Sequence, residues 1–353
     1  MTEILLTIFF ISVLLIFLGS GIWVAISMVG VSSIGMMLFT TRPVGDAMAT
    51  TIWGASSSWT LTALPLFVWM GEILFRTKLS ENLFEGLSPW MQKLPGGLVH
   101  VNVVGCALFA AISGSSAATV ATVGKMSIPE LRKRKYPETI LLGSLAGSGT
   151  LGLLIPPSII LIIYGVTVQE SIAKLFIAGI VPGIMIALIF MTYVMIWSLI
   201  NKKSMPTFKQ DFSLMEKVRK SGKLIPVILL IVSVIGSIYT GIATATEAAS
   251  LGVVGALILS YFQKSLSLRT FKESLLGATK TSCMIAFILA GATFLSLAMG
   301  FTGLPRNLAL WIEGMELSPY VLIFVLMIFY IILGLFLDGI SAVVLTMAII
   351  EPM

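Results

Sequence analysis

Charged side chains are scarce in this sequence. They make up only 11% of its 353 residues, whereas hydrophobic residues make up 57%. A water-soluble globular chain carries roughly twice that share of charge, because it must present a polar surface to water. A soluble protein is therefore excluded, and we expect the chain to lie in a lipid bilayer.

Cysteine and histidine are also nearly absent. The two cysteines, Cys106 and Cys283, lie inside apolar runs, where a thiol behaves as a small hydrophobic group. The single histidine, His100, has no cysteine cluster or hydroxyl–acid pair beside it, so neither a transition-metal site nor a catalytic triad is expected. An intramembrane hydrolase is only a remote alternative, because Asp338 and Glu247 have no His or Lys partner in an apolar run. The chain is not expected to be an enzyme.

Basic residues exceed acidic ones, with 22 Lys and Arg against 16 Asp and Glu, for a net charge of +6. They lie in short loops between apolar runs and do not form one face, so membrane topology explains them and nucleic-acid binding is not expected. A bilayer-spanning helix needs roughly 20 apolar residues. Apolar runs of about this length lie at 4–18, 21–39, 61–75, 140–166, 172–200, 224–239, 247–262, 282–301 and 320–337. The sequence therefore predicts an all-α polytopic membrane protein.

The basic loops also predict the orientation of the chain. With the N-terminus outside and each run crossing once, only Arg42, Lys174 and Arg306 lie outside. All other Lys and Arg residues then fall inside, as the positive-inside rule requires. This assignment holds only if residues 97–131 enter and leave the membrane on the same side.

Residues 97–131 are therefore predicted to form a re-entrant helical hairpin. Lys93 precedes the segment, Arg132 follows it, and Ser113-Gly114-Ser115-Ser116 lies in its middle. A single spanning helix would place the two basic ends on opposite sides, whereas a hairpin with a Ser/Gly tip keeps them together. Non-helical backbone at that depth is tolerated only where protein buries it or a polar cavity wets it. The tip hydroxyls are oxygen ligands of the kind that hard cations prefer, although small residues also pack helices against each other.

A second break is predicted at 147–158. Pro156 and Pro157 cannot donate to the carbonyls of Gly152 and Leu153, so a helix here must open and leave acceptors free. Four residues that come before the break supply hydroxyls and flexible backbone: Gly147, Ser148, Gly149 and Thr150. We interpret the segment as an unwound span that binds a cation or substrate together with the tip. A proline kink with a satisfied backbone is the alternative.

The sequence contains a weak internal repeat. Gly54-Ala55 corresponds to Gly277-Ala278, residues 113–117 correspond to 338–342, and Pro129 corresponds to Pro352, in the same order and at nearly the same spacing. In the predicted topology the two copies open toward opposite sides. Inverted repeats with paired broken segments indicate a secondary transporter whose site lies near the bilayer midplane.

The second copy of the tip is Asp338-Gly339-Ile340-Ser341. An ionisable group within an apolar segment is a functional hypothesis by default, so Asp338 is predicted to act in cation binding or gating, with a helix cap as the alternative. Glu247 has another explanation, because Thr244 and Glu247 have the spacing of a capping box at a helix start.

Motifs that cover nearly the whole chain in order are ALPLF at 63–67, Gly71-Glu72, SGSSAAT at 113–119, GSGTLGLLIPP at 147–157 and YTGIATATEAA at 239–249. Together they resemble the large membrane subunit of tripartite ATP-independent periplasmic (TRAP) transporters. The resemblance implies an ion-transporter fold with two re-entrant hairpins and a discontinuous helix, in which a transport domain moves against a scaffold as an elevator.

The resemblance also implies a function. It predicts a sodium-coupled permease in the bacterial inner (cytoplasmic) membrane, with a periplasmic N-terminus, that imports an organic anion such as a C4-dicarboxylate or sialic acid. The implied partners are a small four-helix membrane subunit and a soluble periplasmic substrate-binding protein. Carried over, one sodium site would lie between the first tip and 147–157, the second at 338–341, and the substrate between them. A stand-alone sodium-coupled anion symporter is the alternative.

The same resemblance divides the chain into parts. Residues 1–96 and 224–319 would form the scaffold and arm helices of the two repeats, 97–165 the first hairpin and unwound helix, 166–223 a connecting helix and basic cytoplasmic loop, and 320–353 the second hairpin. The family pattern continues past the second tip into another proline-containing unwound span, whereas this sequence stops at Met353. We therefore expect the sequence to be truncated.

Overall fold

The computed structural model describes residues 2–77, 79–206, 212–335, 337 and 339–350. These residues form helices joined by loops, without a strand, which confirms the predicted all-α class. They divide into two compact units. The terminal unit comprises Met1–Leu61, Val166–Gln169 and Thr281–Met353, and the hairpin unit comprises Thr62–Gly165 and Glu170–Lys280.

Three helices of the described chain are long and apolar enough to cross a membrane: α10 (Ile172–Ile200), α13 (Ala245–Phe262) and α14 (Leu268–Thr302). Two helix pairs, each bent by 54° at a short break, meet the same criteria when taken together: Val44–Ser56 with Trp59–Phe75, and Leu214–Ser221 with Ile225–Tyr239. In the most apolar stretch of α10 only 17% of residues are buried, as expected for a helix that faces lipid tails. These helices fit a polytopic membrane protein.

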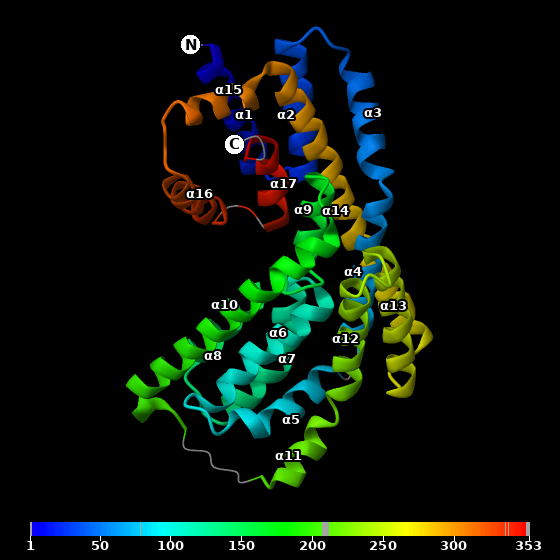
Figure 1. The fold of residues 1–353 in the computed structure, drawn as a ribbon, viewed down its shortest axis with the longest axis vertical. Coiled ribbons are helices and arrows are strands. Elements are labelled where there is room, and N and C mark those ends of the chain that lie inside the picture. Colours follow the sequence, from blue (N-terminus) through cyan, green and yellow to red (C-terminus); the bar gives the residue numbers. More distant parts are fainter. Residues whose placement is uncertain (1, 78, 207–211, 336, 338, 351–353) are drawn as a thin grey trace. The chain divides into compact units, whose positions relative to one another are not determined.

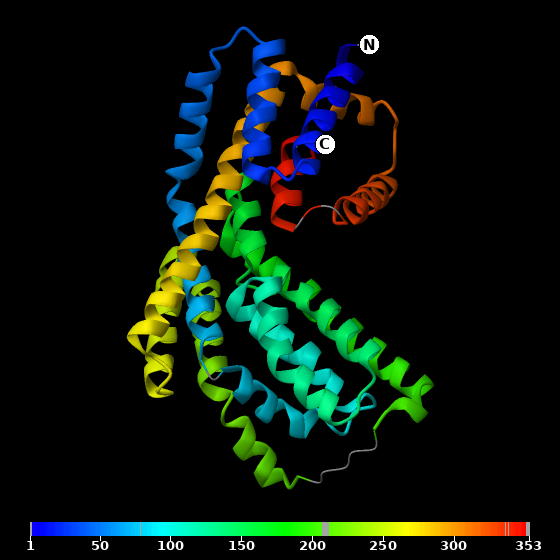
Figure 2. The same cartoon turned by 180° about the vertical axis from the view of Figure 1, so that it is seen from behind.

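The centre of the hairpin unit is a pair of helices, α6 (His100–Ser113) and α7 (Ser116–Lys133). Gly114 ends α6 with φ at +58°, in the left-handed region that glycine adopts without a steric penalty. Ser115 precedes α7 as its N-cap, because its hydroxyl accepts the N–H of Ala118 at 3.4 Å. The two helices lie side by side with α8 (Glu138–Gly149) against both (Figures 1 and 2).

The first part of α14, up to Lys280, belongs to the hairpin unit. Helices that precede and follow the α6–α7 pair in the sequence also belong to it. They are α4 (Ala63–Phe75), α5 (Leu79–Met91), α11 (Leu214–Ser221) and α12 (Ile225–Tyr239), together with α10 and α13. The Tyr239 hydroxyl donates to the Phe176 carbonyl at 3.2 Å and joins α12 to α10. The Trp90 indole donates to the Ser221 hydroxyl at 2.8 Å and joins α5 to α11. Helix α4 packs along α13 and also contacts α6.

The terminal unit contains the first and last helices of the chain. They are α1 (Thr2–Gly19), α2 (Val24–Phe39), α3 (Val44–Ser56), the later part of α14, α15 (Leu304–Glu313), α16 (Pro319–Leu333) and α17 (Gly339–Ile350). Met36, Phe294 and Ala298 form a fully buried cluster in this unit. The hydroxyls of Tyr330 and Thr346, 2.6 Å apart, link α16 to α17.

The predicted capping box at the start of α13 is present. The Thr244 hydroxyl accepts the Glu247 N–H at 3.3 Å, and the Glu247 carboxylate accepts the Thr244 N–H at 2.8 Å. Thr244→Ala is therefore expected to lower the free energy of unfolding by about 1 kcal/mol, measured by thermal unfolding in detergent. Thr246→Ala lies in the same helical turn but outside the box, so an equal loss in both variants would contradict the assignment.

Candidate functional site

The predicted tip closes on itself through its own hydroxyls. The Thr119 hydroxyl donates to the Ser115 carbonyl at 2.8 Å, so its only hydrogen is used there. The Ser113 hydroxyl lies 3.0 Å from the Thr119 hydroxyl and 3.3 Å from the Ser115 carbonyl, and its hydrogen can be donated to either oxygen. The Ser115 carbonyl also accepts the Thr119 N–H at 3.0 Å, which leaves this oxygen fully occupied. Ser113, Thr119 and the Ser115 carbonyl thus hold the shape of the tip.

Two other hydroxyls at the site have no such partner. The oxygens of Ser116 and Ser148 are buried, and neither forms a hydrogen bond with any described residue. Ser116 is the first residue of α7 and Ser148 lies in the last turn of α8. A buried hydroxyl without a partner costs about 1–3 kcal/mol, so each calls for a water molecule or an ion as its partner.

The predicted break at 147–158 is present. After α8 the chain forms a short 3₁₀ helix, η3 (Thr150–Leu153), and the next helix, α9 (Ile159–Thr167), begins only after the two prolines. The expectation that both freed carbonyls lack a donor is wrong for Leu153, because the Ser158 hydroxyl donates to it at 2.5 Å. For Gly152, the structure shows no donor among the described residues.

The break and the tip are in direct contact. The Ile159 N–H, at the start of α9, donates to the Gly114 carbonyl at 3.4 Å. A Cβ on Gly114 would lie 2.8 Å from the Pro157 carbonyl oxygen, and a Cβ on Gly152 would lie 2.9 Å from the Ser115 carbonyl carbon. Real side chains do not approach backbone that closely, so both positions accept only glycine in this packing. The structure thus brings the two halves of the first predicted site together.

Two further glycines enclose this contact and were not predicted as site residues. A Cβ on Gly71 of α4 would lie 3.0 Å from the Ser113 Cα, and a Cβ on Gly179 of α10 would lie 2.7 Å from the Leu154 carbonyl oxygen. Gly71 belongs to one of the family motifs. Gly179 and Gly183 have the small-xxx-small spacing of a close helix contact in membranes, which is the signal that identifies this face of α10.

The remaining predicted residues of the first site lie at its edge. Thr150 is exposed, and its hydroxyl donates to the Gly147 carbonyl at 2.7 Å. A Cβ on Gly147 would meet the Phe190 ring of α10 at 3.2 Å, and one on Gly149 would meet the Val120 side chain of α7. These two glycines therefore let α8 approach its neighbours, whereas Ser148 between them contributes the buried hydroxyl.

The second predicted site lies in the terminal unit. Gly339, Ile340 and Ser341 form the start of α17, and Ser341 is fully buried. Asp338 lies outside the described residues. Gly339, Ile340 and Ser341 thus lie at a helix start, as Ser116 does at the start of α7.

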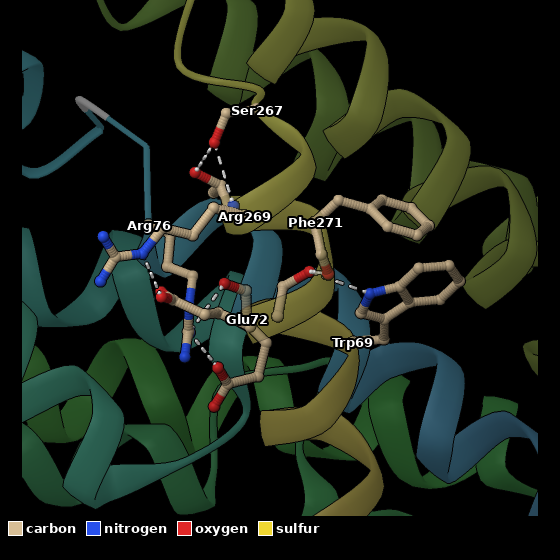
Figure 3. Close-up of polar contacts among 9 residues, drawn as sticks. Trp69, Glu72, Arg76, Ser267, Arg269 and Phe271 are labelled. Atoms are coloured by element: carbon tan, nitrogen blue, oxygen red, sulfur yellow. Dashed lines mark hydrogen bonds and ion pairs between the residues drawn. The ribbon is translucent and has the colours of Figure 1, made fainter.

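A polar junction between α4 and α14 was not predicted (Figure 3). Arg76 forms an ion pair with Glu72 one turn earlier and reaches Glu273 at 3.9 Å, and Glu273 also pairs with Arg269 at 2.8 Å. Nearby, the Trp69 indole donates to the Ser274 hydroxyl at 3.2 Å. These charges are partly exposed, and such pairs are each worth about 0–1 kcal/mol. The junction therefore orients two helices without adding much stability.

A Cβ on Gly277 would lie 2.6 Å from the Glu72 carboxylate. Gly277 thus makes room for Glu72, one of the two acidic residues of the junction. The sequence signals for this junction are the spacing of Glu72 and Arg76 on one helix face and the presence of Gly277 in the internal repeat.

Comparison with known proteins gives a consistent result. The family model described as "Tripartite ATP-independent periplasmic transporter, DctM component" matches residues 10–353. The chain is 33% identical over 314 residues to the C4-dicarboxylate TRAP transporter large permease protein DctM of Pseudomonas aeruginosa, covering 89% of this chain and 72% of that protein. The protein of the same name from Rhodobacter capsulatus is 31% identical, with 97% and 81% covered. The sialic acid TRAP transporter large permease protein SiaM of Vibrio cholerae is 29% identical, with 95% and 78% covered.

Proposed function

Because the chain belongs to the DctM-component family of tripartite ATP-independent periplasmic transporters, we propose that it is the permease subunit of a sodium-coupled importer of an organic anion. Members of this family are transporter permeases and not enzymes. The family and the apolar helices place the chain in the bacterial inner membrane.

The observation that carries the sodium assignment is the pair of buried hydroxyls at Ser116 and Ser148. Sodium is a hard cation that takes oxygen ligands. The Ser116 hydroxyl and the Gly152 carbonyl, at the contact between the tip and the break, and the Ser148 hydroxyl, in the last turn of α8, are oxygens without a donor among the described residues. A sodium ion held there would satisfy groups that are otherwise costly to bury. These oxygens are of the type that sodium prefers, which supports the proposal.

The length of α6 supports a hairpin that enters and leaves on one side. Helix α6 has 14 residues, which at 1.5 Å per residue is about 21 Å. The hydrocarbon core of a bilayer is about 30 Å thick. A helix that starts beside the basic loops would therefore end within the membrane, past the midplane but short of the opposite face. Broken helices at that depth are typical of secondary transporters.

The remaining parts of the proposal follow from the family. The two hairpins, 97–165 and 320–353, would move as the transport domain of an elevator against the scaffold and arm helices of 1–96 and 224–319. The anion would bind between the first site and a second sodium site at 338–341. A small four-helix membrane subunit and a periplasmic substrate-binding protein would complete the transporter, and the N-terminus would be periplasmic. The named relatives favour C4-dicarboxylates or sialic acid as cargo.

Uptake by proteoliposomes tests this function. The subunit, reconstituted with its small membrane partner and loaded binding protein, is expected to take up a radiolabelled C4-dicarboxylate or sialic acid only when an inward sodium gradient is imposed. Replacing sodium with choline, or omitting the binding protein, is expected to reduce uptake to that of empty liposomes. Uptake by the large subunit alone would support the stand-alone symporter instead. Equal uptake in choline would exclude sodium coupling.

A further inference from the structure

A cavity of about 290 Å³ lies at the open end of the α6–α7 hairpin, where the two helices begin and end, away from the tip. Its walls come from the loop before α6, the loop after α7 and the last turn of α10 with the residues that follow. The polar side chains that line it are Gln92, Arg134, Tyr136, Ser198 and Lys202. The volume is at the lower limit of the ~300–1,000 Å³ typical of small-molecule sites, so the cavity suits a small polar group.

The charge of this cavity is positive. Arg134 and Lys202 line it, and among the described residues no Asp or Glu lines it. Glu130 pairs with Arg134 at 3.7 Å from outside the lining. Arg132 is engaged elsewhere, because it donates to both carboxylate oxygens of Glu138 at 2.7 and 3.1 Å. This hydrogen bonding lowers the pKa of Glu138, and Arg132 does not line the cavity.

The polar groups of the wall suit a phosphate that carries further hydroxyls. The Tyr136 hydroxyl accepts the Leu98 N–H at 3.2 Å, so its own hydrogen can be donated to an anion. The Ser198 hydroxyl also lines the cavity. A hydroxyl can accept a hydrogen bond from a hydroxyl of a ligand. The wall therefore contains two cations, Arg134 and Lys202, and the Tyr136 phenol, which can bind a phosphate. It also contains an oxygen that can accept a hydrogen bond from a ligand hydroxyl.

The surroundings of the cavity are apolar on one side. Leu199 lines the cavity and is 50% exposed, and its neighbours Ile196 and Ile200 on α10 are 54% and 77% exposed. Helix α10 is one of the helices able to cross a membrane. The cavity thus opens beside a surface that fits lipid tails. A soluble phosphate would use only the polar wall, whereas a lipid would use both surfaces.

We propose that this cavity binds the headgroup of an anionic phospholipid that carries hydroxyls, such as phosphatidylglycerol, with its acyl chains along the exposed face of α10. Basic pockets between membrane helices at the cytoplasmic surface are suited to such headgroups. The lipid would connect the open end of the hairpin to the end of α10. This assignment is independent of sodium coupling and of the transported anion.

Native mass spectrometry of the full chain in detergent tests the proposal, with phosphatidylglycerol and phosphatidylcholine of equal chain length as probes. Wild-type protein is expected to retain phosphatidylglycerol in preference to phosphatidylcholine. Lys202→Gln should weaken phosphatidylglycerol binding about fivefold, because one basic residue near a charged lipid surface contributes about 1 kcal/mol. Lys203→Gln is the matched control, since Lys203 is the adjacent exposed lysine and does not line the cavity. Equal affinity in the two variants would overturn the proposal.

A second variant and a soluble competitor separate the remaining explanations. Arg134→Gln is expected to weaken binding as much as Lys202→Gln, whereas Glu130→Gln, which removes the same ion pair but leaves the cation, should not. Glycerol 3-phosphate supplies the headgroup chemistry without acyl chains and should compete only at far higher concentration. Competition at the same concentration as the lipid would show a site for soluble phosphates and overturn the lipid assignment. Loss of binding in Glu130→Gln would also overturn it, by showing that the ion pair and not the positive charge is required.

Discussion

Gly152→Ala is expected to destabilise the protein by about 1–3 kcal/mol, the usual cost of an added methyl group in a packed site. The new Cβ would lie 2.9 Å from the Ser115 carbonyl carbon and 3.0 Å from the Ser116 nitrogen. Both are backbone atoms, which cannot rotate away as the end of a side chain can. The opposing gain from a less flexible unfolded chain is about 0.4–1 kcal/mol, so the clash dominates. The substitution should also separate the tip from the break and reduce uptake.

Gly143→Ala is the matched control for this prediction. Gly143 lies in α8, and a Cβ there would meet nothing within 4 Å. Alanine is favoured over glycine inside a helix. The free energy of unfolding of this variant is therefore expected to equal that of the wild type or to exceed it by up to about 1 kcal/mol. Denaturant unfolding in detergent and uptake by proteoliposomes measure both variants. Wild-type stability in Gly152→Ala would show that the tip and the break do not pack rigidly.

Replacing Ser116 with leucine is expected to abolish sodium-coupled uptake while leaving membrane insertion intact. Its hydroxyl is buried without a partner among the described residues, and a leucine there would fill the space proposed for the ion with an apolar group. Replacing a serine with leucine does not lower the hydropathy of the segment, on which membrane insertion depends. Unchanged uptake would remove the tip from the transport mechanism.

Ser116→Ala separates ion binding from bulk. Thermal unfolding is titrated with sodium against choline at constant ionic strength. Wild-type protein should show a saturable, sodium-specific rise of about 2.7 kcal/mol at a hundredfold excess over Kd. Removing one oxygen ligand should weaken the sodium Kd about tenfold or more, because a hydrogen-bonding group that contacts a charge is worth about 1.5–3 kcal/mol.

Ser250→Ala is the control for the sodium titration. Ser250 is exposed on α13 and donates to the Thr246 carbonyl at 3.1 Å, so its removal should leave the sodium response unchanged. An identical sodium response in Ser116→Ala and wild type would show that this hydroxyl is not a ligand. A wild-type protein that responds equally to sodium and choline would contradict the sodium site itself.

Features that depend on a few neighbouring residues could be predicted from the sequence. The two prolines, Pro156 and Pro157, lack the N–H that a helix needs, so the break occurs where they stand. Gly114 allows the left-handed turn between α6 and α7. Thr244 and Glu247 form their capping box within one helical turn. In each case the physical cause lies within a few residues along the chain.

The partners of each carbonyl and hydroxyl could not be predicted in this way. The proline argument freed the carbonyls of Gly152 and Leu153, but the Ser158 hydroxyl reaches one of them. The role of Gly179 depends on α10 crossing the break at close range. Whether a polar atom finds a partner is decided by the atoms that packing places around it, and these come from distant parts of the chain.

Composition, charge placement and motifs by themselves determined that this chain is a membrane protein of the TRAP permease family, since hydropathy and family motifs are properties of the sequence. Only the tertiary structure decided that the tip contacts the break, with Gly71 and Gly179 enclosing the contact. Only the tertiary structure left Ser116 and Ser148 as the buried hydroxyls in need of a partner there. The reason is that close approach of backbones and the satisfaction of buried polar groups depend on how several helices pack, which no single segment specifies.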